Sequence, residues 1–287
     1  MRAVYKRELR SYFTNMTGYV FIGVLLLLTG IMCTVMNLSY ASPNFEYTLS
    51  TVSYIFLLIV PILTMNVFAE ERRSKTDRLL YSLPLSTADI IAGKFLALMT
   101  VFAVPVLLMC LIPPILSMYG TVSFATAYSS LAGFFLMGCS LLAFGFLISS
   151  LTESPVIAAV ISFFSLLLIY LLSTLSTLIP RSASASAAAF LILAASLAFV
   201  IWFFTKNITV SAAFVALCAA VIIIIYNVKQ SALEGAFPDM LDALCVYDRL
   251  GSFLNGMFDV GAAVYFLSVT AVCLVLAGQI YDRRRYN

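Results

Sequence analysis

The stretch from Phe95 to Thr152 reads FLALMTVFAVPVLLMCLIPPILSMYGTVSFATAYSSLAGFFLMGCSLLAFGFLISSLT and contains no charged residue. A helix needs about 20 apolar residues to cross a bilayer, so this run is long enough for two crossings. A turn signal at Tyr119 and Gly120, with Ser123 nearby, separates its two halves. The run therefore predicts two membrane-spanning helices, at 91–116 and 126–150.

Uncharged stretches of similar character lie on both sides of this run. They are Ser11–Phe45, Tyr47–Ala69, Ser154–Pro180, Ser182–Thr205, Asn207–Val228 and Val260–Tyr281. They predict further spans at 17–38, 50–69, 155–179, 185–204, 208–227 and 260–281. The composition agrees, because only 10% of the 287 residues are charged, against about 25% in soluble domains. We therefore expect an all-α membrane protein, a polytopic bundle of about eight transmembrane helices in a single domain over 1–287.

The basic residues predict the orientation of this bundle, because Lys and Arg concentrate in cytoplasmic loops. With the N-terminus inside, the outer segments hold only Arg181, Lys229 and Arg249 of the sixteen basic residues. Both termini are then expected in the cytoplasm and the chain in the cell membrane. The net charge of +3 reflects this asymmetry. No basic stripe with interleaved aromatic residues indicates a nucleic-acid partner.

The sequence lacks the usual groups for metal binding, acid-base catalysis and nucleotide binding. Histidine is absent, no cysteine pair has CxxC spacing, and no acid lies in the middle of a predicted span. Five of the six cysteines fall inside predicted spans and Cys245 in an outer loop, which favours packing over a metal or redox site. There is also no GxxxxGK[ST] phosphate loop. We expect no metal, no cofactor and no enzymatic activity in this chain, so energy for uphill transport would come from a partner.

Residues 2–13, RAVYKRELRSYF, precede the first span and separate by face at helical spacing. One side carries Tyr5, Leu9, Tyr12 and Phe13, and the other carries Arg2, Lys6, Arg7 and Arg10. The pattern fits a helix lying in the headgroup plane with its cations toward anionic lipid. A simple positive-inside anchor explains the same charges, and both interpretations stay open.

The segment 70–94, EERRSKTDRLLYSLPLSTADIIAGK, is the one sizeable charged cytoplasmic segment between spans. Its first part predicts a short interfacial helix with Leu79, Leu80 and Leu83 that ends at Pro84. Ser86 with Asp89 three residues later then reads as a variant of the capping box. A helix that starts there is expected to run on into the third span, so that force on its tip reaches the membrane. The alternative is a charged loop that is simply solvated.

The residue pattern of this segment closely resembles ABC-2 type permeases, the exporter membrane subunits related to gliding-motility and NosY-like permeases. The matching residues are Glu70, Glu71, Arg72, Arg73, Ser74, Thr76, Leu79, Leu80, Pro84, Ser86, Ile90 or Ile91, Gly93 and Lys94. Further matches lie at Lys6–Phe21, Ser149–Phe163 and Phe253–Asp259. The resemblance covers both ends and the first five predicted helices.

The resemblance implies contacts with a separate ATP-binding subunit. The part that looks like a coupling helix consists of Ser86, Thr87, Ala88, Asp89, Ile90 and Ile91. The supporting motif is Glu70, Glu71, Arg72, Arg73, Thr76, Pro84, Gly93 and Lys94, and a second, minor contact falls at Thr152, Glu153 and Ser154. Such permeases normally work as two permease chains with two ATPases that hold ATP and magnesium.

Related permeases usually have six spans, so this chain resembles a six-helix core with an inserted helical hairpin at 185–227. The hairpin begins with RSASASAAAF, which fits a packed span or a linker. The following outer segment, 229–259, is amphipathic and is expected to form short helices broken at Pro238 and Gly251. It would serve as a lid over an exit or as a structural cap.

These features together predict a permease of an ATP-driven exporter. The aromatic and Met-rich walls would suit an amphipathic or lipid-like cargo. Two rival functions stay open, an ion-coupled secondary carrier and a membrane scaffold without transport. The missing intramembrane acid counts against the carrier.

Overall fold

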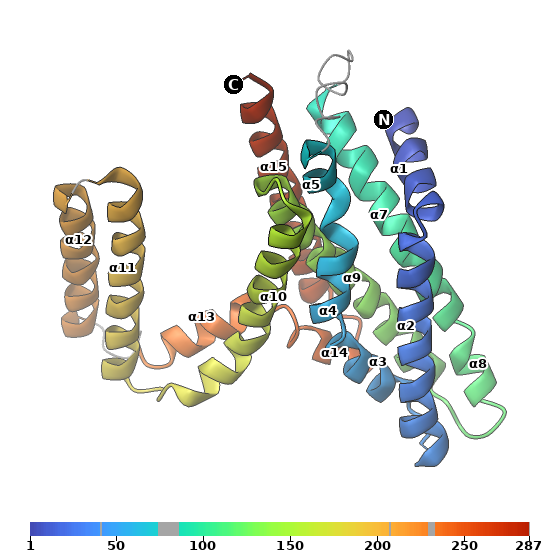
Figure 1. The fold of residues 1–287 in the computed structure, drawn as a ribbon. Helices are drawn as coiled ribbons and strands as arrows, with labels where there is room; N and C mark the ends of the chain where they lie inside the picture. The colour runs from blue at the N-terminus through green and yellow to red at the C-terminus, as the bar shows by residue number, and fades with distance from the viewer. Residues whose placement is uncertain (41, 74–85, 207, 229–232, 287) are drawn as a thin grey trace. The chain divides into compact units, whose positions relative to one another are not determined.

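A computed structural model of the chain describes residues 1–40, 42–73, 86–206, 208–228 and 233–286 (Figure 1). Within these ranges the chain forms helices and no β-strand, which confirms the all-α prediction. The helices are α1 (Arg2–Thr14), α2 (Thr17–Cys33), the π-helix η1 (Thr34–Ser39), α3 (Phe45–Ser53), α4 (Phe56–Thr64), α5 (Asn66–Arg73), α7 (Thr87–Met109), α8 (Ile112–Leu116), α9 (Phe124–Leu151), α10 (Pro155–Leu178), α11 (Ala183–Thr205), α12 (Ile208–Val228), α13 (Ala236–Leu244), α14 (Leu250–Leu254) and α15 (Val260–Tyr286).

Several of these helices are long and apolar enough to cross a membrane. Among the described residues five qualify, namely Thr17–Ser39, Thr87–Leu116, Phe124–Leu151, Pro155–Leu178 and Val260–Arg284. A sixth candidate is a bent pair, Phe45–Ser53 with Phe56–Arg73, whose two parts meet at 56°. The span expected at 50–69 is thus longer than predicted and is broken at Tyr54 and Ile55. The multi-pass membrane architecture is confirmed, and the count of eight spans stays a prediction.

The chain divides into two compact units, which are described one at a time. The first comprises residues 1–167 and 249–287, and the second comprises residues 168–248.

Helix α9 forms the centre of the first unit. It packs against α3, α4, α5, α7, α14 and α15. Its most apolar stretch is 72% buried, whereas that of α2 is 17% buried. Small residues allow this close packing. At Gly133 an added Cβ would lie 2.7 Å from the Cβ of Phe253 on α14, so only glycine fits there. The rings of Phe56, Phe102 and Phe134 pack on one another, and Phe102 lies against Gly138 of α9.

The second unit contains the region predicted as an inserted hairpin. Helices α11 and α12 pack against each other, and α13 packs against α11. The rings of Phe190 and Phe237 meet edge to face at 5.0 Å. Ala183–Ala198 and Ala212–Ile223 are apolar helical stretches shorter than a full span in the described part of the chain. Asn207, between the spans predicted at 185–204 and 208–227, lies outside the described residues.

The breaks expected in the outer segment lie elsewhere than predicted. Pro238 sits in the first turn of α13, where a missing backbone N–H costs nothing, so it begins a helix and does not break one. Gly251 lies inside α14. The break in helical structure falls between the end of α13 at Leu244 and the start of α14 at Leu250.

Candidate functional site

Helix α7 begins with a side-chain cap. The backbone N–H of Asp89 donates to Ser86 Oγ at 3.1 Å, and the Ser86 hydroxyl donates to Asp89 Oδ2 at 2.8 Å. This is the capping-box variant expected from the sequence. From Thr87 the helix continues to Met109 without a break. The tip of the predicted coupling segment is therefore the start of the helix that forms the third span.

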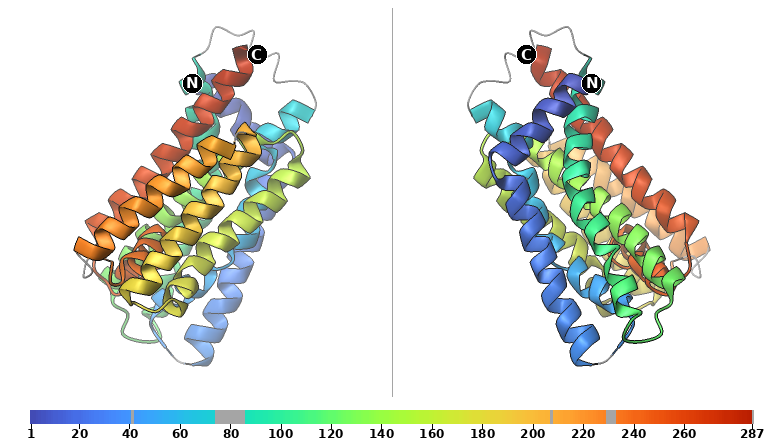
Figure 2. Two further views of the ribbon diagram at one scale, coloured as in Figure 1. Left: turned by 90° about the vertical axis from the view of Figure 1, so that its left-hand side faces the viewer. Right: turned by 90° about the vertical axis from the view of Figure 1, so that its right-hand side faces the viewer.

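The tip of α7 contacts both ends of the chain. The amino group of Met1 lies 3.7 Å from Asp89 Oδ1. The Thr87 hydroxyl donates to Asp282 Oδ2 of α15 at 3.3 Å. The N-terminus, the start of α7 and the end of α15 accordingly lie at one end of the first unit (Figures 1 and 2). We call this end the predicted cytoplasmic face.

The six residues of the predicted coupling segment differ in exposure. Ser86 and Ala88 are exposed, and the Asp89 side chain is 43% exposed. Ile90 and Ile91 are buried in the bundle. The surface that a partner can reach thus consists of Ser86, Thr87, Ala88 and Asp89, while the two isoleucines hold α7 in place.

A buried lysine ties three helices together one to two turns below this tip. The Lys94 side chain of α7 is 1% exposed. Its Nζ lies 2.9 Å from Glu71 Oε2 of α5 and 3.2 Å from Glu8 Oε1 of α1, and it donates to the Val67 carbonyl at 2.9 Å. The ammonium also lies 5.2 Å from the centre of the Phe68 ring. A buried cation needs this degree of pairing, because an unpaired charge away from water is costly.

Arg7 completes this charged cluster, which consists of Arg7, Glu8, Glu71 and Lys94. Its guanidinium donates to Glu71 Oε1 at 2.6 Å and also to Glu8. Burial favours a raised pKa for Glu8, but the charge of Lys94 and the hydrogen bond from Arg7 outweigh it and hold the Glu8 pKa below its ordinary value. One of the two interpretations that the sequence left open placed Arg7 toward anionic lipid with Arg2, Lys6 and Arg10. Arg7 instead pairs with carboxylates inside the protein.

Gly93 allows α1 to approach α7 closely enough for this pairing. A Cβ at Gly93 would lie 3.1 Å from the Val4 Cβ, tighter than most real contacts. Val4 is buried there, and the Tyr5 hydroxyl lies 3.1 Å from Thr100 Oγ1 further along α7. The two helices run side by side in Figure 1. Gly93 and Lys94 of the predicted motif thus both help to dock α1 against α7, and Lys94 also binds α5.

The second predicted contact, Thr152 to Ser154, forms the short link between α9 and α10. Arg72 of α5 donates to the Thr152 carbonyl at 3.1 Å. Arg284 of α15 donates to Glu153 Oε1 at 3.2 Å and to the Leu151 carbonyl at 2.8 Å. The Glu153 side chain remains 78% exposed. This link therefore joins the predicted cytoplasmic face, with a side chain available to a partner.

The structure brings much of the predicted site together. Glu71, Arg72, Gly93 and Lys94 take part in the contacts described above, Arg73 ends α5, and Thr76 and Pro84 lie outside the described residues. The sequence analysis missed Glu8, Asp282 and Arg284 as members. Glu8 could have been noticed in the sequence, because it is the only acid within the otherwise basic residues 2–13.

Comparison with known families identifies the chain. The family described as ABC-2 family transporter protein matches residues 10–280, a range that includes the tip of α7, the link at Thr152 and all five candidate spans but the last residues of α15. A comparison with curated proteins gave no match. The chain therefore belongs to the ABC-2 transporter family and is a multi-pass permease of the cell membrane.

Proposed function

We propose that this permease is the membrane half of an exporter whose energy comes from a separate cytoplasmic ABC ATP-binding subunit. ABC-2 permeases normally work with such a subunit. The ATP and magnesium would bind to that partner, and two permease chains with two ATPases would form the transporter. Gliding-motility and NosY-like permeases remain the predicted subtype.

The observation that carries this proposal is the unbroken course of α7 from an exposed tip into the bundle. Ser86 and Ala88 are exposed at its start, and the helix runs on for 23 residues. An α-helix rises about 1.5 Å per residue, so α7 is a continuous rod that extends from the tip deep into the bundle. A partner that pushes on the tip would therefore displace the membrane part of α7 and would not merely bend a loop.

The contacts around the tip support transmission to further helices. Asp89 and Thr87 connect α7 to Met1 and Asp282, and Lys94 connects it to α1 and α5. Motion of α7 would thus be shared by α1, α5 and α15. Glu153, which pairs with Arg284, would offer the partner a second and smaller contact on the same face.

The decisive experiment places a bulky cation on the tip. Ala88 is an exposed alanine at the second position of α7, and Ala125 is an exposed alanine at the second position of α9. Ala88→Arg is expected to reduce co-purification of the ATP-binding subunit and ATP-driven transport in vesicles. Ala125→Arg, the matched control at a different helix start, is expected to leave both unchanged.

Two results would refute the proposal. One is that the native permease, purified from its own membrane, carries no ATP-binding subunit with it. The other is an Ala88→Arg protein that retains both partner binding and transport. Gradient-dependent, ATP-independent uptake would instead favour an ion-coupled carrier, and absence of any transport would favour a scaffold.

A further inference from the structure

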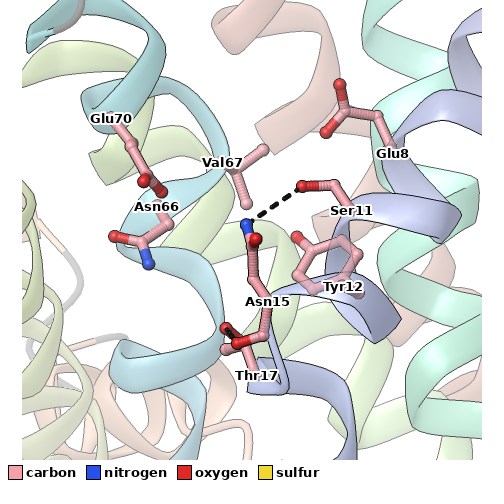
Figure 3. Close-up of a pocket in the computed structure, with 8 residues that line it drawn as sticks. All are labelled: Glu8, Ser11, Tyr12, Asn15, Thr17, Asn66, Val67 and Glu70. Atoms are coloured by element: carbon pink, nitrogen blue, oxygen red, sulfur yellow. Dashed lines mark hydrogen bonds between the residues drawn. The ribbon is translucent and has the colours of Figure 1, made fainter.

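The inner side of helix α1 is occupied by contacts with α5 and α7. Val4 lies against Gly93 of α7, and Glu8 pairs with Lys94. Figure 3 shows where this side of α1 meets α5 around a small polar cavity. The polar side chains of α1 and of the residue after it that line this cavity are Glu8, Ser11, Tyr12 and Asn15. These positions recur every three or four residues, so they share one side of the helix.

The opposite side of α1 carries three basic residues. Arg2, Lys6 and Arg10 are spaced four residues apart, so they form a stripe along one face. With 3.6 residues per turn, Arg10 points about 160° away from Glu8. All three basic residues are exposed. We call Arg2, Lys6 and Arg10 the basic stripe.

The positive charges of the basic stripe are not neutralised by the described residues. In the part of the chain that the structure describes, none of the three side chains forms an ion pair. Glu8, the only acid of α1, pairs with Arg7 and Lys94, and its side chain is 12% exposed. The outer side of α1 therefore presents positive charge that is free to bind an anionic partner.

The contacts of α1 place the basic stripe at the level of the membrane boundary. Val4 lies against Gly93, and the Tyr5 hydroxyl lies 3.1 Å from Thr100 Oγ1. Gly93 and Thr100 both belong to the candidate span Thr87–Leu116. Helix α1 thus lies beside the first turns of a membrane helix, and its outer side faces the headgroup layer. An ATP-binding subunit would instead approach the tip of α7, which begins before these residues.

Side chains at the junction of α1 with the first span mark the same level. Tyr19 is 61% exposed, and its ring meets the ring of Phe13 edge to face at 5.1 Å. Exposed tyrosines are typical of the membrane–water interface. Arg10 precedes the start of the first span at Thr17 by seven residues, which is about 10 Å of helix. That distance is about one Debye length at 0.1 M salt, so Arg10 lies within reach of headgroup charge.

We infer that the basic stripe of α1 binds anionic phospholipid headgroups of the adjacent leaflet. The guanidinium groups of Arg2 and Arg10 can each donate two hydrogen bonds to a phosphate, and Lys6 adds a point charge between them. The sequence alone left open whether these cations only anchor the N-terminus on the inner side. Their depth and their lack of an acidic partner in the described chain favour a lipid contact. Because Lys94 joins α1 to α7, the bound lipid would also hold the helix that carries the coupling tip.

Native mass spectrometry of the intact permease in detergent tests this inference. The protein is titrated with phosphatidylglycerol or with phosphatidylcholine of the same chain length. One Lys or Arg near an anionic membrane strengthens binding about fivefold. Phosphatidylglycerol is therefore expected to bind at least about tenfold more tightly than phosphatidylcholine. Equal affinity for the two lipids would overturn the inference without any variant being needed.

Two double variants that remove the same amount of charge locate the site. Lys6→Gln with Arg10→Gln neutralises two members of the basic stripe. Arg73→Gln with Arg283→Gln is the matched control, because it neutralises two exposed cations on α5 and α15. The stripe variant is expected to lose phosphatidylglycerol affinity at least about tenfold, and the control to change it less than about twofold. Equal losses in the two variants would show a response to total charge and would refute the stripe as the site.

The same variants separate the lipid site from the proposed function. A stripe variant that loses its ATP-binding subunit and keeps its affinity for phosphatidylglycerol would assign the stripe to a protein partner and overturn the lipid site. A permease that prefers phosphatidylglycerol through the stripe and never binds an ATPase would refute only the proposed function.

Discussion

The ammonium group of Lys94 on α7 lies 2.9 Å from the carboxylate of Glu71 on α5, and the lysine side chain is 1% exposed. Lysine and glutamate are almost never fully buried unless paired. The pair therefore marks a place where three helices meet around charge, since Glu8 of α1 faces the same ammonium. This relationship explains how the two ends of the charged segment 70–94, at Glu71 and Lys94, come together in one structural feature.

Replacing Lys94 by Met is expected to destabilise the permease by about 3–5 kcal/mol, because it removes the buried cation between Glu8 and Glu71 and leaves both carboxylates with Arg7 alone. Arg73→Met removes an exposed charge from the end of α5 and is expected to change stability by less than about 0.5 kcal/mol. Thermal unfolding of the purified proteins in detergent compares them. Adding Glu71→Gln to Lys94→Met should recover part of the loss. A Lys94→Met protein as stable as Arg73→Met would contradict a structural role for the cluster.

Acidification is expected to destabilise the permease in part through Glu8. The Glu8 pKa lies below its ordinary value of 4.5 in the folded protein, so the unfolded chain binds its proton more readily. Its contribution to stability is complete above about pH 4.5 and is lost as pH falls through the folded pKa. Melting temperatures measured across this range should fall less steeply with acidification in Glu8→Gln than in the native protein. Parallel curves would show that Glu8 does not contribute.

Removal of the Ser86 cap is expected to loosen the first turn of α7. Ser86→Ala loses the bond to the Asp89 backbone N–H and should cost about 1 kcal/mol. Ser86→Asp restores an acceptor and is the matched control. Hydrogen exchange at the Asp89 amide reports the change directly, because that amide loses its partner. Unchanged exchange in Ser86→Ala would mean that the cap does not hold the tip in solution.

Gly133→Ala is expected to destabilise the permease by about 1–3 kcal/mol, because the added methyl group overlaps with Phe253. Gly278 on α15 is the matched control, since no atom lies within 4 Å of a Cβ built there. Gly278→Ala should be neutral or stabilising by up to about 1 kcal/mol. Thermal unfolding distinguishes the two. Equal stability of both variants would contradict the close packing of α9 on α14.

Features that depend on near neighbours in the chain were predictable. Long apolar runs led to helices at 17–39, 87–116, 124–151, 155–178 and 260–284, close to the expected positions. The cap at Ser86 was equally readable, because its partner Asp89 lies only three residues away. The bend between α3 and α4 was not predictable, since the proline of that span, Pro61, lies after the break and not at it.

The sequence alone determined that the chain is a helical membrane protein, because apolar length and the positions of Lys and Arg follow directly from the cost of placing polar groups in lipid. Only the tertiary structure decided that Glu8 pairs with Lys94 and that Thr87 of α7 meets Asp282 of α15. Such contacts link residues far apart in the chain. They depend on how closely helices approach, which is set here by the missing side chain of Gly93 against Val4 and carries no periodic signal in the sequence.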